Sequence, residues 1–284
     1  MMKAVLFYAP GNIKYTEVEV PEITPTEVMM KIDTALTCGT DVKTFRRGHP
    51  VLIKKVPSGF GHEFSGTIEA IGSEVNNFEI GQRVVAVNSA PCNNCYYCRI
   101  NRQNLCDNLE LLNGAYAQYI VIPKNIVAQN MIVIPDNISF EEAAFVEPLA
   151  VVLHGIEMSD IEIGKTVGVI GLGPIGLLFV KLAKLKGARV IAMGRNPLKL
   201  KMVEEFGNPD EIVDLSKYKH PEKIIMDLTP ERKGLDVVIE AVGLPEIWEN
   251  ALSLTRKGGT INLFGGCESG TKIQVDTRRL HYDE

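Results

Sequence analysis

Four cysteines lie close together in the first half of this 284-residue chain. Two residues separate Cys92 from Cys95 and Cys95 from Cys98, and Cys106 follows eight residues later. Two-residue gaps let backbone turns direct successive thiolates at one centre, and a fourth thiolate completes a tetrahedral shell around zinc. Because four protein ligands leave no open position for a substrate, the spacing predicts a structural zinc ion that stiffens this loop.

Two other chemistries compete for these four thiols. A disulfide is disfavoured, because clustered cysteines in a reducing compartment bind metal more often than they pair, and Cys-x-x-Cys closes a strained ring. An iron–sulfur cluster also takes four thiolates and stays open at this point.

Three further residues of metal-binding type are scattered along the chain. Cys38 lies in Thr-Cys-Gly-Thr-Asp, His62 in Gly-His-Glu, and Glu147 in Val-Glu-Pro-Leu. Zinc accepts thiolate, imidazole and carboxylate ligands. Each residue also has a purely structural interpretation: a small buried thiol, a hydrogen-bonded core histidine and a surface charge before a helix. The residues alone leave these alternatives open.

A glycine-rich turn in the second half predicts a nucleotide site. Residues 171–176 (Gly-Leu-Gly-Pro-Ile-Gly) follow an apolar strand at 167–170 and open a helical pattern at 174–186. In that context the glycines permit a tight turn and bring backbone amides close to a dinucleotide pyrophosphate. The residues expected to bind the cofactor are Gly171, Gly173, Pro174, Ile175 and Gly176.

The end of the next strand bears on which cofactor is used. NAD-specific folds usually carry an acidic residue there that holds the ribose hydroxyls and repels a 2′-phosphate. This chain has Gly194 and Arg195 instead, and a guanidinium pairs well with phosphate. The sequence therefore favours NADP(H) over NAD(H), with stacking of Arg195 on adenine as the alternative.

Two different patterns of predicted strands and helices position these residues. Before about residue 150 the chain reads as short alternating strands, expected at 4–8, 14–20, 28–36, 65–71, 83–87 and 117–122. After it, strands at 167–170, 189–193, 211–213, 236–239 and 260–264 alternate with helices at 174–186, 198–206, 221–228 and 246–255. The first pattern predicts a barrel or sandwich and the second a parallel sheet, with a boundary near 149–159.

Composition narrows the classes of partner. A net charge of −5 provides no basic field for nucleic acid, and the longest apolar run is too short to span a bilayer. The N-terminus lacks a cleavage site after its short apolar stretch. We therefore expect a cytoplasmic protein with a small-molecule partner.

Taken together, five segments resemble the zinc-dependent medium-chain dehydrogenases, in the branch of the sorbitol and threonine dehydrogenases. The resemblance covers essentially the whole chain and is carried, in order, by residues 38–41, 61–66, 92–106, 147–149 and 171–176. It implies an α/β protein with a GroES-like β-barrel catalytic domain at residues 1–150 and a Rossmann NAD(P)-binding domain at 151–284.

The resemblance also implies roles for particular residues. Cys38 and His62 would bind a catalytic zinc ion, the second of two per chain. Glu63 and Glu147 would ligate that ion or hold its water, and the Thr40 hydroxyl would take the substrate proton. A carboxylate at 147, where yeast and liver alcohol dehydrogenases carry cysteine, places the chain nearer the polyol and threonine enzymes.

Such a zinc ion lowers the pKa of a bound alcohol, so that the alkoxide passes hydride to the nicotinamide. The expected substrate is a secondary alcohol: a polyol, a sugar alcohol or a threonine-like compound. Since hydride transfer needs no one-electron centre, zinc is favoured over an iron–sulfur cluster at the four cysteines.

The chain departs from many relatives at the end of the proton relay, where a histidine five residues after the cysteine is replaced by Lys43. Lys43 could end the relay, His49 or water could replace it, or Lys43 could bind a cofactor phosphate. Side chains expected to select the substrate are Phe45, Arg46, Arg47 and Phe60.

Other functions remain open on sequence grounds. A zinc-stabilised nucleotide-binding or sensing protein would need only the four clustered cysteines, and a zinc-free quinone reductase relative would lack them along with Cys38 and His62. Relatives typically continue for several dozen residues past the equivalent of Glu284. The resemblance implies a homo-oligomer for the full-length protein. For this chain, an inactive dehydrogenase fragment is the alternative function.

Overall fold

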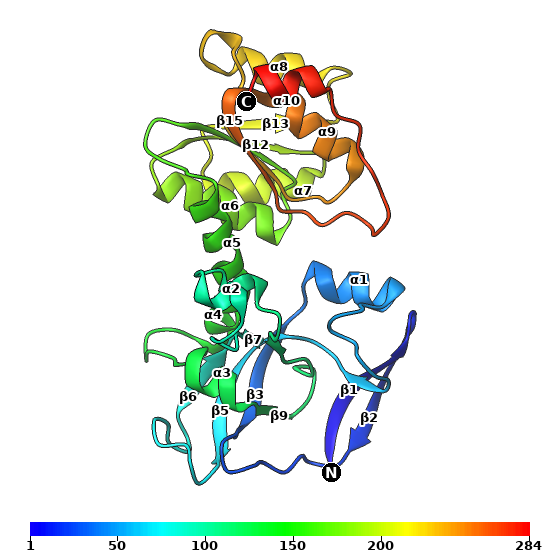
Figure 1. Cartoon of the computed structure of the whole chain (residues 1–284), viewed down its shortest axis with the longest axis vertical. Coiled ribbons are helices and arrows are strands. Elements are labelled where there is room, and N and C mark those ends of the chain that lie inside the picture. The colour runs from blue at the N-terminus through cyan, green and yellow to red at the C-terminus, as the bar shows by residue number, and fades with distance from the viewer. The chain divides into compact units, whose positions relative to one another are not determined.

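The computed structural model describes all residues from 1 to 284. The chain divides into two compact units, Met1–Pro148 and Leu149–Glu284 (Figure 1). Each unit has hydrophobic clusters of its own, so each is built around its own core.

Antiparallel strands form the body of the first unit. A five-stranded sheet has the order β10-β6-β5-β3-β9, with bounds Met131–Val133, Arg83–Ala86, Glu63–Ile71, Val28–Leu36 and Tyr119–Ile122. A second sheet has the order β2-β1-β4, with bounds Asn12–Val18, Met2–Ala9 and Ser58–Gly59. Alternating side chains of β3 are buried, with Val28 and Met30 fully inside. Each of the six strands predicted in this half corresponds to a strand of the structure; the one at 28–36 has the predicted bounds and the other five have shifted ends.

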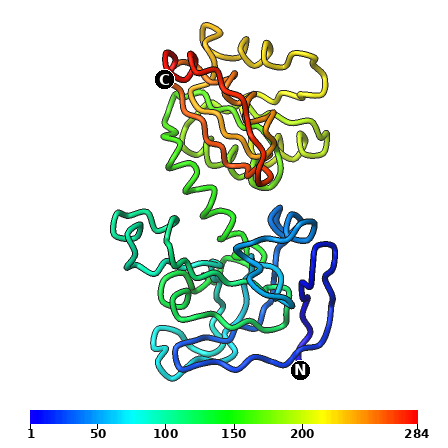
Figure 2. The backbone as a smooth tube through the Cα atoms, turned by 45° about the vertical axis from the view of Figure 1, so that its right-hand side comes forward, coloured from blue at the N-terminus to red at the C-terminus, as the bar shows by residue number.

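Short helices connect these strands. They are α1 (Gly39–Arg47), α3 (Lys124–Gln129) and α4 (Phe140–Ala144). The four cysteines lie in a lobe made of β7 (Ser89–Ala90), α2 (Tyr96–Arg99), the 3-10 turn η1 (Gln103–Leu105) and β8 (Glu110–Leu111). Figure 2 shows this segment leaving the sheet as a separate cyan-green loop.

The second unit is a parallel sheet with the strand order β13-β12-β11-β14-β15. The bounds in that order are Glu211–Asp214, Arg189–Gly194, Thr166–Ile170, Leu235–Glu240 and Thr255–Leu263. The order reverses direction between β11 and β14, which is where ligands bind in open parallel sheets. The predicted alternation of strands and helices is confirmed.

Helices cover both faces of this parallel sheet. One hydrophobic cluster joins the sheet to α5 (Val146–Met158) and α6 (Pro174–Leu185), through Ile156 and Phe179. The other joins it to α8 (Pro221–Asp227) and α9 (Pro245–Leu254), through Ile225 and Ala251. Both faces are therefore buried, as the apolar composition of β11 requires.

Several details differ from the expected elements, beginning with the short helices of the first unit, which were not predicted. The helix expected at 198–206 is split into α7 (Pro197–Met202) and a single π-helical turn, η2 (Val203–Gly207). The expected boundary segment at 149–159 is largely helical, because α5 runs through it. A last helix, α10 (Thr277–Tyr282), was not expected. No helix is both long enough and apolar enough to cross a membrane.

Candidate active site and structural metal site

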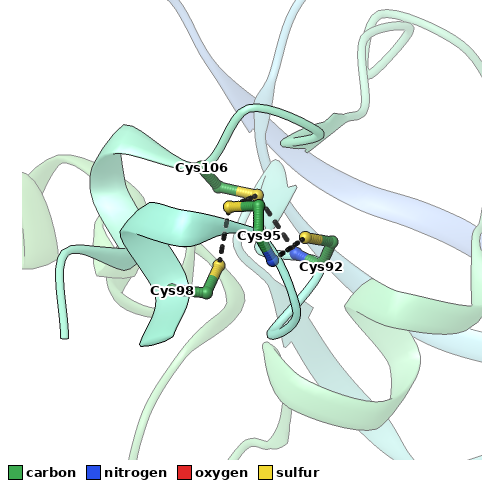
Figure 3. A group of neighbouring side chains, drawn as sticks. All are labelled: Cys92, Cys95, Cys98 and Cys106. Carbon is green, nitrogen blue, oxygen red and sulfur yellow. Dashed lines mark hydrogen bonds between the residues drawn. The ribbon is translucent and has the colours of Figure 1, made fainter. Parts of the chain in front are cut away.

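The four clustered cysteine side chains point at one another (Figure 3). The Sγ atom of Cys95 lies 3.5 Å from that of Cys98 and 3.8 Å from that of Cys106. With Zn–S bonds of about 2.3 Å, the edges of a tetrahedral shell are roughly 3.8 Å long. The arrangement and the donor chemistry therefore fit a four-coordinate structural zinc ion, as the spacing predicted.

Local backbone geometry builds this cluster. Asn93 adopts a left-handed conformation (φ 57°), which turns the chain between Cys92 and Cys95. The backbone N–H of Cys95 then donates to Cys92 Sγ at 3.3 Å. Hydrogen bonds from backbone N–H groups lower the pKa of Cys92 to about 6, whereas burial raises that of Cys98 to about 12. Backbone N–H donors therefore favour the thiolate at Cys92, while metal binding must displace the proton of Cys98.

The second cluster starts at the N-terminus of α1. Cys38 is the N-cap of this helix, and its Sγ atom accepts a hydrogen bond from Thr40 N at 3.2 Å. The Asp41 carboxylate accepts one from Cys38 N at 3.0 Å, which completes a capping box. His62 precedes β5, whose first residue Glu63 pairs with Leu36 at the end of β3. This pairing brings Cys38 Sγ to 3.3 Å from His62 Nε2.

The two ring nitrogens of His62 face different groups. Nε2 faces the thiol, whereas Nδ1 lies 3.2 Å from Asp41 Oδ1, within ion-pair distance but without hydrogen-bond alignment. Burial alone would lower the pKa of His62, but the Asp41 carboxylate and Cys38 outweigh it and raise the pKa to about 10. A carboxylate on one nitrogen and a soft ligand beside the other is the arrangement that orients histidine ligands of zinc. A tetrahedral zinc ion needs roughly 3.5 Å between such sulfur and nitrogen atoms, so this pair fits.

Two carboxylates complete the site from another direction. The ligand atoms of His62, Glu63 and Glu147 lie within 4.8 Å of one another. Burial raises the pKa of Glu147 to about 7 and raises that of Glu63 as well. Cys38 and Glu147 do not belong to one group at that distance: Cys38 groups with Asp41 and His62, and His62 is the residue that both groups share. The structure therefore brings the four predicted ligands together around His62.

Asp41 belongs to this site, although no role was predicted for it. It is buried, with 4% of its surface exposed, and burial would raise its pKa. His62 and the Cys38 N–H hold its pKa below the usual value instead. Its position three residues after Cys38 in Cys-Gly-Thr-Asp is the only local signal of the capping box.

The remaining candidates surround this cluster. Thr40 and Lys43 lie on α1, where Lys43 is exposed. His49 Nδ1 accepts from Val51 N at 3.3 Å and from Leu52 N at 3.1 Å, so only its Nε2 is available for a relay. Burial and the charge of His62 lower the pKa of His49. Because the charge of His62 influences the pKa of His49, His49 lies near the cluster.

One expected substrate-selecting residue is in the wrong place for that role. Phe60 is not a loop residue facing a substrate: it is 4% exposed and packs between Phe7 and Tyr116, with ring centroids 6.0 and 5.6 Å away. It precedes a strand in the sequence, so its apolar side chain joins the core.

The glycine turn lies between β11 and α6 at the sheet's reversal point. Gly171 has a φ of 97°, and a Cβ atom at Gly176 would lie 1.8 Å from Gly171 O, so the fold requires both glycines. At Gly173 a Cβ atom would meet nothing within 4 Å and φ is −73°. The fold does not require glycine there, and open space beside an uncapped helix N-terminus fits a bound pyrophosphate.

The corner after β12 is shaped by packing as well as charge. A Cβ atom at Gly194 would lie 2.8 Å from Leu172 Cδ1, so a side chain there would require the Leu172 side chain to move. Arg195 is exposed, and Asn196 caps α7 by accepting from Leu198 N and Lys199 N. This corner therefore carries a guanidinium and lacks the acidic residue of NAD-specific folds.

Comparison with known proteins agrees with this geometry. A family model described as the alcohol dehydrogenase GroES-like domain matches residues 24–136, and one described as zinc-binding dehydrogenase matches residues 174–284. The sequence is 33% identical to sorbitol dehydrogenase of Bacillus subtilis over 272 residues, which cover 93% of this chain and 75% of that protein. The chain belongs to the zinc-binding dehydrogenase family.

Other members of the family resemble this chain in sequence and fold. L-threonine 3-dehydrogenase of Mesorhizobium japonicum is 33% identical, with 99% of this chain and 82% of that protein covered. A zinc-binding dehydrogenase from Sinorhizobium meliloti 1021 bound to NADP has a TM-score of 0.89 and 33% identity, covering 100% and 82%. Galactitol-1-phosphate dehydrogenase of Escherichia coli has a TM-score of 0.86 and 27% identity, covering 99% and 79%.

Membership of this family confirms several expectations. The chain is an α/β dehydrogenase with a GroES-like domain and a Rossmann-like parallel sheet. It is an oxidoreductase of the zinc- and NAD(P)-dependent alcohol dehydrogenase type. The main expectation drawn from the sequence is therefore favoured over a nucleotide-sensing protein.

Proposed function

We propose that this dehydrogenase transfers hydride reversibly between a secondary alcohol of the polyol class and NADP(H), and that it holds two zinc ions per chain. The observation that carries the proposal is the pair formed by Cys38 Sγ and His62 Nε2, 3.3 Å apart beside the buried Glu63 and the half-buried Glu147. Unlike the four-cysteine cluster, Cys38 and His62 supply only two ligands, so one carboxylate could bind as well and a position would stay open for a substrate oxygen. The proposed zinc-containing catalytic domain is residues 1–150, and the proposed nucleotide-binding domain is 151–284.

A zinc ion at this cluster would polarise the substrate oxygen, and a nicotinamide would take up the hydride. Cys38 and His62 bind that metal in the proposal, and Asp41 keeps His62 Nε2 directed at it. Glu147 would ligate that ion or hold its water. Glu63 shares this role, and the Thr40 hydroxyl takes the proton of the alcohol.

The polyol class follows from the carboxylate at 147 and from the names of relatives. The relatives include a sorbitol dehydrogenase, a D-arabinitol dehydrogenase and L-threonine 3-dehydrogenases. Sugar alcohols and threonine-like compounds share a secondary hydroxyl beside a second polar group. We therefore rank vicinal diols and sugar alcohols ahead of simple alcohols.

The preference for NADP(H) has separate support in the second unit. Gly194 places no acidic side chain beside the glycine turn, and Arg195 provides an exposed guanidinium at the same corner. A phosphate on the adenosine ribose would pair with that guanidinium. The neighbour from Sinorhizobium meliloti was solved with NADP.

A screen of secondary alcohols and the matching ketones, with NADP(H) and NAD(H) in parallel, tests the proposal. We expect the unmutated chain to turn over at least one polyol. Cys38→Ser should abolish this activity, whereas Cys267→Ser, a matched substitution outside both proposed metal sites, should keep it. Turnover that survives in Cys38→Ser would show that the metal cluster is not the reaction centre.

A further inference from the structure

Tyr116 lies in the segment that leads into β9, and its hydroxyl reaches the metal cluster from behind. The hydroxyl oxygen is 2.9 Å from Asp41 Oδ2, and Asp41 Oδ1 in turn faces His62 Nδ1. The same oxygen lies 2.9 Å from the Leu36 carbonyl and 3.0 Å from Thr37 Oγ1. Tyr116 is therefore one contact away from a proposed zinc ligand without touching the metal site itself.

Backbone contacts on both sides fix the ring of Tyr116. Its N–H donates to the Phe60 carbonyl at 2.8 Å, and its own carbonyl accepts from Val5 N at 2.7 Å. The ring covers Gly61 so closely that a Cβ atom there would lie 2.7 Å from it. The position of the hydroxyl is thus set by contacts with strand β1 and with Phe60 and Gly61, in addition to its bond to Asp41.

The hydrogen bonds of Asp41 show what this hydroxyl contributes. Oδ2 accepts from only two donors, Cys38 N and the Tyr116 hydroxyl, and Oδ1 is left to face His62. A phenol has a single proton to donate, and a carboxylate is a stronger acceptor for it than a peptide carbonyl. Without that hydroxyl, Oδ2 keeps one donor, and the carboxylate gains freedom to turn away from the imidazole.

We propose that Tyr116 is a positioning residue for the catalytic metal, which it stabilises by holding Asp41 against His62. The inference rests on the proposed function, because it assigns a zinc ion to the cluster of Cys38 and His62. Partners that hold a histidine ligand from behind typically contribute about 10–100-fold to metal affinity. Tyr116 acts through Asp41, one contact further away, so we expect about a 3–10-fold contribution.

Zinc release to a chromophoric chelator, measured on the zinc-loaded chain, tests this role without relying on activity. We expect Tyr116→Phe to release one zinc ion about 3–10-fold faster than the unmutated chain and to leave the release of the other unchanged. The four-cysteine site is the internal reference, because its zinc would report any general loosening of the fold. Tyr119→Phe, which removes the same atom from the nearby strand β9, is the matched control and should release both ions at the unmutated rates.

A second background separates positioning from simple packing. In Asp41→Asn the carboxylate is lost while its shape is kept, so adding Tyr116→Phe to that variant should accelerate release little further. Unchanged release from Tyr116→Phe, faster release of both ions, or the same acceleration in the Asp41→Asn background would each overturn the inference. An unmutated chain that binds only one zinc ion would overturn the proposed function first, and the inference with it.

Discussion

The two proposed metal sites are built from residues in different ways: one from cysteines close together in sequence, the other through contacts between distant segments. Cys92, Cys95 and Cys98 lie within seven positions of each other, so their convergence could be predicted from spacing alone. Asp41 and Tyr116 are 75 positions apart, and only the pairing of strands brings them together. Contacts of that second kind have no local pattern, which is why the support behind His62 was not predicted.

Arg195 carries a prediction about cofactor choice. Replacing it with aspartate, Arg195→Asp, removes the phosphate partner and adds a carboxylate that can hold ribose hydroxyls, so the ratio of kcat/KM with NADP to that with NAD should fall. A loss of one charge-assisted contact of about 1.5–3 kcal/mol corresponds to roughly a tenfold to hundredfold fall in that ratio. Steady-state kinetics with both cofactors measure it, and a native enzyme that already prefers NAD would refute the assignment.

At the scale of elements, the alternation of buried and exposed residues predicted the strands well, and the segment 28–36 has the predicted bounds. Helix α1 was not predicted, because it has no apolar stripe: the residues that it buries are Asp41 and Thr44. Helix α5 was missed for a different reason. Pro148 is the third residue of α5, and the change there from alternating strands to strand–helix repeats had indicated a domain boundary.

The glycine turn between β11 and α6 gives a paired prediction. Gly173→Ala adds a methyl group in open space at an ordinary φ, so the melting temperature should stay unchanged while the dissociation constant for the cofactor rises about tenfold. Gly176→Ala drives a methyl group into the Gly171 carbonyl and should destabilise the fold by about 1–3 kcal/mol. Calorimetric binding and thermal unfolding distinguish the two. Equal effects of both substitutions on stability would contradict an open cradle at Gly173.

Asp210, which contacts both α6 and β12, gives a prediction about pH. Asp210 binds Lys184 Nζ and Val190 N, each at 2.7 Å; burial alone would raise its pKa, but these partners hold the pKa below the usual 3.8. Because the folded state favours the charged carboxylate, the stabilisation is fully present above pH 3.8 and is lost as the pH falls through the lowered pKa.

Asp210→Asn should therefore lower the melting temperature at pH 7, and the difference from the unmutated chain should shrink as the pH approaches 3. The pair is partly exposed, so its contribution should stay below about 1 kcal/mol. A difference in melting temperature that is the same from pH 7 down to pH 3 would show that the carboxylate charge is not the source.

On the scale of the whole molecule, the functional groups divide cleanly between the two units. Every proposed metal ligand lies within Met1–Pro148, whereas the glycine turn and Arg195 lie within Leu149–Glu284. The change from alternating strands to strand–helix repeats indicated this division in the sequence, since the two kinds of layer need different patterns of burial. Metal binding and nucleotide binding should therefore respond to separate sets of substitutions.

Zinc content per chain, measured on the unmutated protein, Cys38→Ser and Cys92→Ser, tests the central claim most directly. The two clusters predict two zinc ions in the unmutated chain and one in each variant, with dehydrogenase activity lost in Cys38→Ser. A single zinc ion in the unmutated chain that persists in Cys38→Ser and disappears in Cys92→Ser would contradict a catalytic metal at Cys38 and His62.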